Sequence, residues 1–244
     1  MNAIILAAGR GMRLNSGDRA AIPKCMEDIN GISIMHYQIK NCLLSGIERF
    51  VIVVGYKKEV LIEHVYEVLK PEQVMFIENE RYAETNTLYS LWLTSEYMCE
   101  SFIYFNADVL FHPDLLEKLF IESSESLLLI EKKPVGEEEV KVVCKNGRIT
   151  RINKQINPTE AEGEFIGIGK FAEKDSTLFI ESLTKGVEMG QHNNYFEWAV
   201  DLMCPQTKLV PVYTDELPCI EIDFPDDLKK AREIFGDIMA YFDI

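Results

Sequence analysis

The residues most suited to chemistry lie in a glycine-rich segment near the start of the sequence. An apolar run over residues 3–8 leads directly to Gly9 and Gly11, and the cations Arg13 and Lys24 follow. Glycine has no Cβ, so backbone N–H groups at such positions can come close to an anion. The guanidinium of Arg13 and the ammonium of Lys24 supply fixed charge for several phosphate oxygens. The segment is typical of a loop that binds the phosphates of a nucleotide.

Two common phosphate-binding loops do not fit this segment. The dinucleotide fingerprint needs a third glycine where this chain has Leu14. The P-loop pattern G-x-x-x-x-G-K-[ST] is absent from the sequence. For the two glycines alone, an ordinary strand-to-loop turn remains an alternative. Arg13 and the Pro23–Lys24 pair favour phosphate binding.

Two aspartates follow apolar, strand-like runs and could hold a divalent metal. Asp108 comes directly after residues 102–106, and Asp223 lies between the apolar Ile222 and Phe224. Carboxylate oxygens are the usual protein ligands of Mg²⁺, which can neutralise the phosphates of a bound nucleotide. The alternative is that each aspartate caps the helix after it.

Together these motifs resemble the nucleotidyltransferase superfamily. The pattern L-A-A-G-x-G-x-R-L followed by P-K, and E-I-D before the last helix, are similar to its motifs. Residues 79–91 resemble the N-x-x-Y-x-x-x-N-N-x-Y-S-L segment of bacterial CTP:phosphocholine cytidylyltransferases, with Thr87 in place of the second Asn of the pair. The resemblance implies that Asp108 and Asp223 hold Mg²⁺ and that Lys24 and Arg13 act in catalysis. It also implies that the nucleotide contacts Leu6, Ala7, Ala8, Gly9, Gly11, Asn86 and Ser90.

A weaker match concerns the second substrate. The segment Tyr195-Phe196-Glu197 resembles the Y-W-D segment of phosphocholine enzymes, which is part of a cage for a quaternary ammonium group. A cation gains about 0.5–2 kcal/mol beside aromatic faces. The alternative is an amphipathic helix that buries its aromatic side chains in the core.

The resemblance therefore implies an enzyme that transfers CMP from CTP to a small phosphorylated acceptor and releases pyrophosphate. Phosphocholine is the first expected acceptor and 2-aminoethylphosphonate the second. A sugar-1-phosphate or inositol-phosphate enzyme using CTP or UTP is an alternative. A non-catalytic nucleotide-binding module is an alternative of another class, although it would have no need to keep the metal pair.

The periodicity of the sequence predicts elements that would place these residues together. Strand-like runs alternate with helix-like ones through the first half, which predicts an α/β fold with a mainly parallel, Rossmann-like sheet and flanking helices. The resemblance implies that this fold is of the nucleotide-diphospho-sugar transferase type. Ligands of such sheets bind at the carboxyl ends of the strands. The turn Asn146-Gly147 predicts a β-hairpin in the second half. We expect a single domain over 1–244, with 1–115 mainly binding nucleotide and 116–244 mainly binding the acceptor. The expected strands are 3–8, 50–55, 74–78, 102–106, 163–171, 209–213 and 219–223, and the expected helices are 34–45, 59–69, 87–98, 175–185, 195–203 and a last one from Pro225.

Composition excludes some classes of partner. The net charge of −15 over 244 residues argues against nucleic acid, whose phosphates would be repelled. No apolar run approaches the ~20 residues of a membrane span. The six cysteines form no C-x-x-C motif and indicate reduced residues of a cytoplasmic protein. The sequence does not exclude a homodimer.

Overall fold

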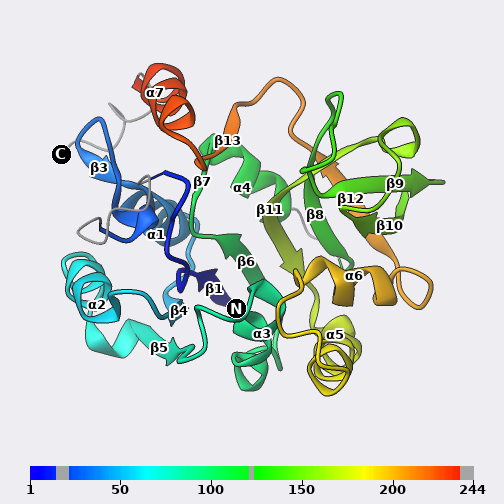
Figure 1. Ribbon diagram of the computed structural model, residues 1–244, viewed down its shortest axis with the longest axis horizontal. Helices are drawn as coiled ribbons and strands as arrows, with labels where there is room; N and C mark the ends of the chain where they lie inside the picture. Colours follow the sequence, from blue (N-terminus) through cyan, green and yellow to red (C-terminus); the bar gives the residue numbers. More distant parts are fainter. Residues whose placement is uncertain (15–21, 121–123, 237–244) are drawn as a thin grey trace.

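The computed structural model describes residues 1–14, 22–120 and 124–236, which fold around one continuous mixed β-sheet (Figure 1). Among the described residues this sheet has nine strands. In their order across the sheet these are β5 (Val74–Glu78), β4 (Arg49–Val54), β1 (Asn2–Leu6), β6 (Phe102–Asn106), β11 (Gly163–Phe171), β8 (Ser126–Glu131), β12 (Leu209–Tyr213), β10 (Arg148–Asn153) and β9 (Lys141–Lys145).

The first half of the sheet is parallel, as the sequence predicts. Strands β5, β4, β1 and β6 all run in the same direction. Their side chains alternate between two cores, with Ala3 and Ile5 in one and Ile4 in the other. Because helices cover both faces, the strands are apolar throughout rather than alternating with polar residues.

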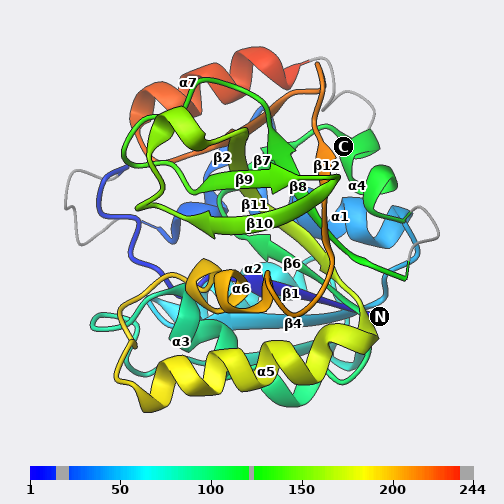
Figure 2. The same ribbon diagram turned by 90° about the vertical axis from the view of Figure 1, so that its right-hand side faces the viewer.

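Helices cover both faces of the sheet (Figure 2). One core contains residues of α1 (Ile34–Leu44), α2 (Lys58–Tyr66), α4 (Pro113–Phe120) and α7 (Pro225–Ile234). The other contains residues of α3 (Thr87–Trp92), α5 (Glu173–Glu188) and α6 (Glu197–Met203). The predicted α/β fold class is confirmed.

The second half of the sheet is largely antiparallel. Strand β11 pairs antiparallel with both β6 and β8, although β8 and β12 are parallel. The predicted hairpin is present as β9 and β10, with φ of 52° at Asn146 and 71° at Gly147. Positive φ at both central residues is what a tight type I′ turn requires. The parallel arrangement expected for the sheet therefore holds for its first half.

Shorter elements complete the fold. Strand β7 (Val109–Phe111) pairs with β13 (Cys219–Glu221), and β2 (Asp28–Ile29) pairs with β3 (Ile32–Ser33). The helix expected over 87–98 ends at Trp92, and a separate 3₁₀ turn follows. The 3₁₀ turns of the described residues are η1 (Lys24–Met26), η2 (Pro71–Gln73), η3 (Ser95–Tyr97) and η4 (Pro158–Glu160).

Two expectations from composition can be compared with the structure. All six cysteines are free thiols, three of them buried. Among the described residues, every helix is too short or too polar to cross a lipid bilayer.

Candidate active site

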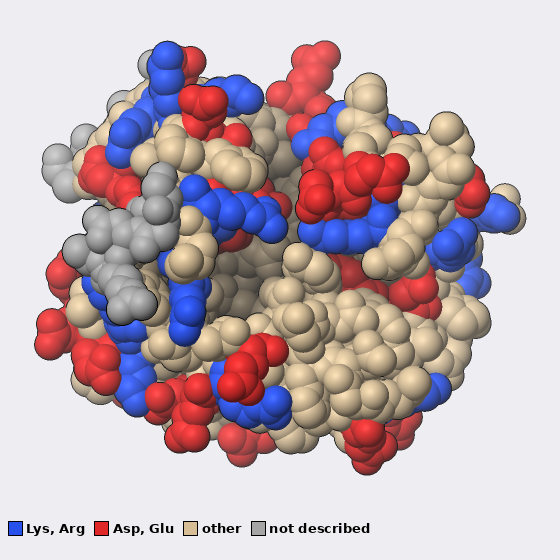
Figure 3. All heavy atoms as spheres, viewed as in Figure 1, with Lys and Arg blue, Asp and Glu red and all other residues tan. Residues whose placement is uncertain are grey.

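A deep cleft lies at the carboxyl ends of β1 and β6. It consists of two cavities of about 750 and 440 Å³ that share part of their lining. Figure 3 shows the hollow in the middle of one face of the molecule, with basic side chains on one rim and acidic ones on another. The shared lining includes the glycine loop and both predicted metal ligands: Leu6, Gly9, Arg13, Asn86, Ala107, Asp108 and Asp223.

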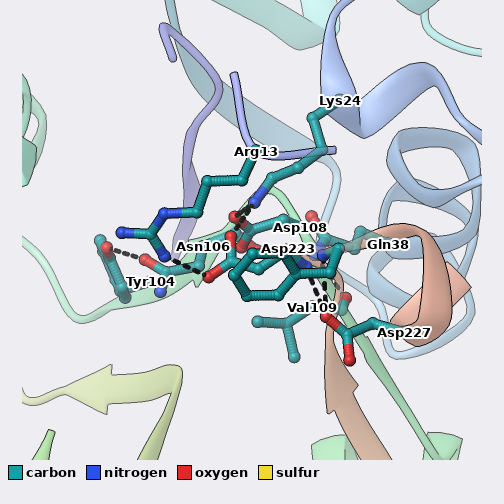
Figure 4. A network of polar contacts seen from close by, with 10 residues as sticks. Arg13, Lys24, Gln38, Tyr104, Asn106, Asp108, Val109, Asp223 and Asp227 are labelled. Atoms are coloured by element: carbon teal, nitrogen blue, oxygen red, sulfur yellow. Dashed lines mark hydrogen bonds and ion pairs between the residues drawn. The ribbon is translucent and has the colours of Figure 1, made fainter. Parts of the chain in front are cut away.

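Asp108 lies in a turn between β6 and β7 that α1 holds in place. The buried side chain of Gln38 donates hydrogen bonds to the carbonyls of Asn106 and Val109, both at 2.8 Å. These bonds clamp the turn from both sides of Asp108 (Figure 4). Asp108 does not cap a helix, because α4 starts only at Pro113.

Asp223 is brought to Asp108 by the pairing of β13 with β7. Glu221 lies opposite Val109 in this ladder, and the N–H of Ile222 donates to the carbonyl of Asp108 at 3.0 Å. The carboxylate that caps α7 is that of Asp227, which accepts from the N–H groups of Asp223 and Phe224. The side chain of Asp223 is therefore available to the cleft, and the capping alternative is wrong for both aspartates.

Two cations from the N-terminal segment bind these aspartates. Lys24 Nζ lies 2.5 Å from Asp108 Oδ2 and 2.7 Å from Asp223 Oδ1, and Arg13 lies 2.9 Å from Asp223 Oδ2. Burial alone would lower the pKa of Lys24, but the two carboxylates outweigh it and raise that pKa above its ordinary value. Burial would raise the pKa of Asp223, whereas Lys24 and Arg13 hold it below its ordinary value. Arg19, a further cation of this segment, lies outside the described residues.

A third carboxylate joins this group and was not predicted from the sequence. Carboxylate oxygens of Asp108, Glu221 and Asp223 lie within 4.8 Å of one another. The side chain of Glu221 is exposed in the cleft. Protein atoms packed around its carboxyl group keep water from part of it, and this desolvation, together with the negative charges of Asp108 and Asp223, raises the pKa of Glu221. The alternation in Glu221-Ile222-Asp223, with Ile222 buried between two acids, was the available signal.

The donor set of these three residues fits Mg²⁺. They offer oxygen ligands only, which is what a hard divalent cation prefers. Asp108 Oδ1 is buried and has no hydrogen-bond partner among the described residues. A buried carboxylate oxygen without a partner is costly unless a cation or donor satisfies it. Asp108, Glu221 and Asp223 would hold the metal.

The glycine loop follows β1 along the floor of the cleft. Leu6, Ala7, Ala8, Gly9 and Gly11 each line at least one of the two cavities. Gly11 has a φ of 59°, in the region that favours glycine. At Gly9 a Cβ would meet no described atom within 4 Å, so the space beside this residue is open to a ligand.

The predicted base contacts Asn86 and Ser90 also face the cleft. Asn86 lines both cavities, but its side-chain oxygen caps α3 by accepting from the N–H of Thr87. Ser90 lines the larger cavity and accepts a hydrogen bond from the buried Asn79 at 2.9 Å. Thr87 accepts from the N–H of Phe196, which ties the start of α3 to the start of α6.

The predicted aromatic cage is not formed as expected. Tyr195 and Glu197 line the larger cavity, but the ring of Phe196 is fully buried and packs on Tyr104. The expectation that Phe196 contacts the acceptor is therefore wrong, and the core alternative applies to it. The physical reason is apolar packing, since its ring also lies against Phe165 and Phe179 in the core, while α6 starts at Glu197, two residues later than expected.

Lys154 was also missed by sequence reasoning. Its ammonium lies over the ring of Tyr195, 4.3 Å from the ring centre. Burial raises the pKa of Glu197 to about 7 even though Lys154 opposes this shift. One oxygen of this carboxylate, Oε2, has no hydrogen-bond partner among the described residues.

A comparison with protein families decides the class of this site. Residues 3–151 match the model of the MobA-like NTP transferase domain. The chain belongs to this family. This NTP transferase is therefore an enzyme of the nucleotidyltransferase class, as the sequence predicts.

Several relatives cover nearly the whole NTP transferase chain. The CTP:phosphoglutamine cytidylyltransferase of Campylobacter jejuni is 28% identical over 96% of this chain and 100% of its own. The choline-phosphate cytidylyltransferase of Streptococcus pneumoniae is 26% identical over 96% of this chain and 98% of its own. Among solved structures, the inositol-1-phosphate CTP transferase of T. maritima superimposes with a TM-score of 0.81 and 26% identity, covering 97% of this chain and 95% of that one.

Proposed function

We propose that this enzyme is a Mg²⁺-dependent cytidylyltransferase that transfers CMP from CTP to a small phosphorylated or phosphonylated acceptor. The observation that carries the proposal is the meeting of Lys24 and Arg13 with three carboxylates at the end of the glycine loop. The relatives in C. jejuni and S. pneumoniae and the T. maritima neighbour are all CTP enzymes with different phosphorylated acceptors.

The reaction forms one P–O bond and breaks another. An oxygen of the acceptor phosphate attacks the α-phosphorus of CTP, and the bond from that phosphorus to the bridging oxygen of the β-phosphate breaks. Pyrophosphate then leaves with the bonding electron pair. The attacking oxygen is already anionic, so no strong general base is required. Bound Mg²⁺ would supply charge neutralisation on the phosphates.

The residues of the chain contribute binding and positioning. The N–H groups of the glycine loop and Arg13 would bind the phosphates of CTP. Lys24 would stabilise the charge that grows as pyrophosphate departs. Asn86 and Ser90 would contact the base. Glu197 and Tyr195 would face the acceptor.

The charge of the cleft favours an acceptor with a cationic group. Quaternary ammonium groups bind to aromatic faces, and of the two rings of the predicted cage Phe196 is buried in the core and Tyr195 is already in contact with Lys154. A primary ammonium can instead donate hydrogen bonds to carboxylates such as Glu197. We therefore place 2-aminoethylphosphonate beside phosphocholine as a first candidate.

A substrate panel tests the proposal. Pyrophosphate release is measured with CTP, UTP, ATP or GTP, with and without EDTA, against phosphocholine, 2-aminoethylphosphonate, inositol-1-phosphate and glucose-1-phosphate. We expect release only with CTP, Mg²⁺ and an aminated acceptor. A preference for inositol-1-phosphate, as the name of the T. maritima enzyme suggests, would overturn the choice of acceptor. Nucleotide binding without release for any acceptor would indicate the non-catalytic alternative.

A further inference from the structure

The segment that joins β8 to β9 forms one wall of the larger cavity. Residues 136–139 read Gly-Glu-Glu-Glu, and Glu138 and Glu139 line the cavity together with Val140. Figure 3 shows acidic side chains gathered on the rim of the hollow in this part of the molecule. The wall lies in the second half of the chain, where the acceptor is expected.

A buried lysine holds this segment in its shape. Lys141 is fully buried, and its ammonium donates to the carbonyls of Gly136, Glu137 and Glu139 at 2.8, 3.0 and 3.2 Å. It forms no ion pair with any described residue. A buried ammonium is costly unless its hydrogen bonds are satisfied. The three carbonyls satisfy it only when the segment is wrapped around the lysine.

Two carboxylates of the loop differ in their contacts: that of Glu139 accepts a hydrogen bond within the loop, whereas that of Glu138 is exposed. Glu139 Oε2 accepts from the N–H of Gly136 at 2.9 Å, which closes the loop a second time. Glu138 is exposed and has no hydrogen bond or ion pair with the described residues. Glu137 belongs to the same loop but is not among the residues that line the cavity.

The rest of the lining leaves negative charge to be balanced. Lys133 pairs with Glu131 at 2.5 Å and with Glu164 at 2.8 Å, so this group already carries its own cation. Glu197 is nine-tenths buried in the same cavity, and its Oε2 has no partner among the described residues. Acidic residues outnumber basic ones along the lining: Asp108, Glu131, Glu138, Glu139, Glu164, Glu197, Glu221, Asp223 and Asp227 against Arg13, Lys133, Lys154 and Lys230.

We propose that Lys141 is a positioning residue that holds residues 136–139 against the cleft, and that Glu138 on this loop makes the enzyme prefer acceptors with a positively charged group. The inference rests on the proposed transfer reaction and assigns residues to its choice of acceptor. Lys141 acts only through the loop, since it is buried beneath it. Glu138 acts through charge, which lowers the KM of a cationic acceptor.

Matched acceptors and matched variants test this assignment. Phosphocholine is compared with 3,3-dimethylbutyl phosphate, which has the same shape without the charge. Glu138→Gln should raise the KM of phosphocholine two- to fivefold and leave the KM of the neutral ester and of CTP unchanged. Glu137→Gln, which makes the same charge change outside the cavity, should leave all three constants unchanged.

Lys141→Met should raise the KM of phosphocholine at least as much, with little change in the KM of CTP. Backbone amides of residues 136–140 should exchange with deuterium faster in this variant than in the wild type. Lys145→Met, at the exposed end of β9, is the control. If Lys141→Met does not fold, Lys141→Gln keeps part of the donor set and serves for the same measurements.

Each part of the proposal has its own contradicting result. Equal effects of Glu138→Gln on both acceptors, or equal effects of Glu137→Gln and Glu138→Gln, would overturn selection by Glu138. Unchanged exchange and unchanged KM in the Lys141 variants would overturn the positioning role. Absence of pyrophosphate release by the wild type with every acceptor would instead contradict the proposed function, while the exchange data would still report on Lys141.

Discussion

Single residues of the cleft form a balanced group of charges that a nucleotide and a metal would rearrange. Lys24 bridges Asp108 and Asp223, and Arg13 binds the second of these. The bridge keeps the two carboxylates from repelling each other in the protein alone. In the proposed reaction the same cations would bind the phosphates, and the carboxylates would hold the metal.

Asp108→Asn and Asp223→Asn should each lower kcat at least about a hundredfold, because each removes an ionised oxygen ligand from the metal. Melting temperatures measured alongside should show that both variants remain folded. Asp226→Asn, in the same segment as Asp223 but not among the residues lining the cleft, is the control and should keep wild-type turnover. A kcat within tenfold of wild type for either aspartate variant would contradict the assignment of that aspartate as a metal ligand.

Loss of Lys24 and loss of Arg13 should affect different constants of the reaction. Lys24→Ala should lower kcat more than it raises the KM for CTP, since charge on the phosphates grows as pyrophosphate departs. Arg13→Ala should mainly weaken CTP binding, which calorimetry measures directly. A pure KM effect at Lys24 would reduce it to a binding residue, and unchanged CTP affinity in Arg13→Ala would count against the glycine-loop interpretation.

Glu197 makes stability depend on pH. Burial raises its pKa to about 7 in the folded protein, from an ordinary value of 4.5. The folded state therefore binds this proton more tightly than the unfolded state, and its stability falls as the pH rises from about 4.5 to about 7. Glu197→Gln removes this penalty and should raise the free energy of unfolding by about 3 kcal/mol at pH 8. At pH 4.5 the change should be small.

Urea unfolding of Glu197→Gln at the two pH values gives the comparison. The exposed Glu188→Gln, on α5, is a matched control and should show no such difference between them. An equal change in stability at both pH values would mean that Glu197 has the same pKa in the folded and unfolded protein, and would contradict the raised pKa.

At the scale of secondary-structure elements, the sequence predicted best those strands that burial of apolar side chains alone determines. Strand β6 begins and ends at the predicted residues, because a parallel strand covered on both faces is a continuous apolar run. Strand β8 was not predicted, since a short apolar run is as compatible with a helix as with a strand. The inward position of Phe196 involves residues distant in sequence, since its N–H donates to Thr87 and its ring packs on Tyr104. Such contacts are not visible in the spacing of the sequence.

The element that orients Asp108 also makes a testable contribution to stability. Gln38→Leu keeps the size of the side chain but leaves the buried carbonyls of Asn106 and Val109 without their donor. We expect the free energy of unfolding to fall by about 1–3 kcal/mol. The concentration of Mg²⁺ that gives half-maximal rate should rise, because the turn carrying Asp108 loosens. Loss of stability with unchanged Mg²⁺ dependence would show that the clamp supports the fold alone.

For the whole molecule, the sequence predicts the nucleotide half of the site better than the acceptor half. The glycine loop and the two aspartates are recognisable because their chemistry fixes residue types at strand ends. Glu221, Lys154 and Lys141 were missed because their roles depend on strand pairing and loop closure that spacing in the sequence does not show. The two halves of the chain join in one sheet through the pairing of β6 with β11, and residues of both halves line the larger cavity.

The central claim, CMP transfer from CTP to an aminated acceptor, is tested most directly by ³¹P NMR of the complete reaction. The purified protein is incubated with CTP, Mg²⁺ and either 2-aminoethylphosphonate or phosphocholine, and every phosphorus signal is followed in time. The account predicts that CTP signals decline while pyrophosphate and a new P–O–P product grow in equal amounts, and that Asp223→Asn abolishes both. Pyrophosphate without the new product, or no change in any signal with either acceptor, would contradict it.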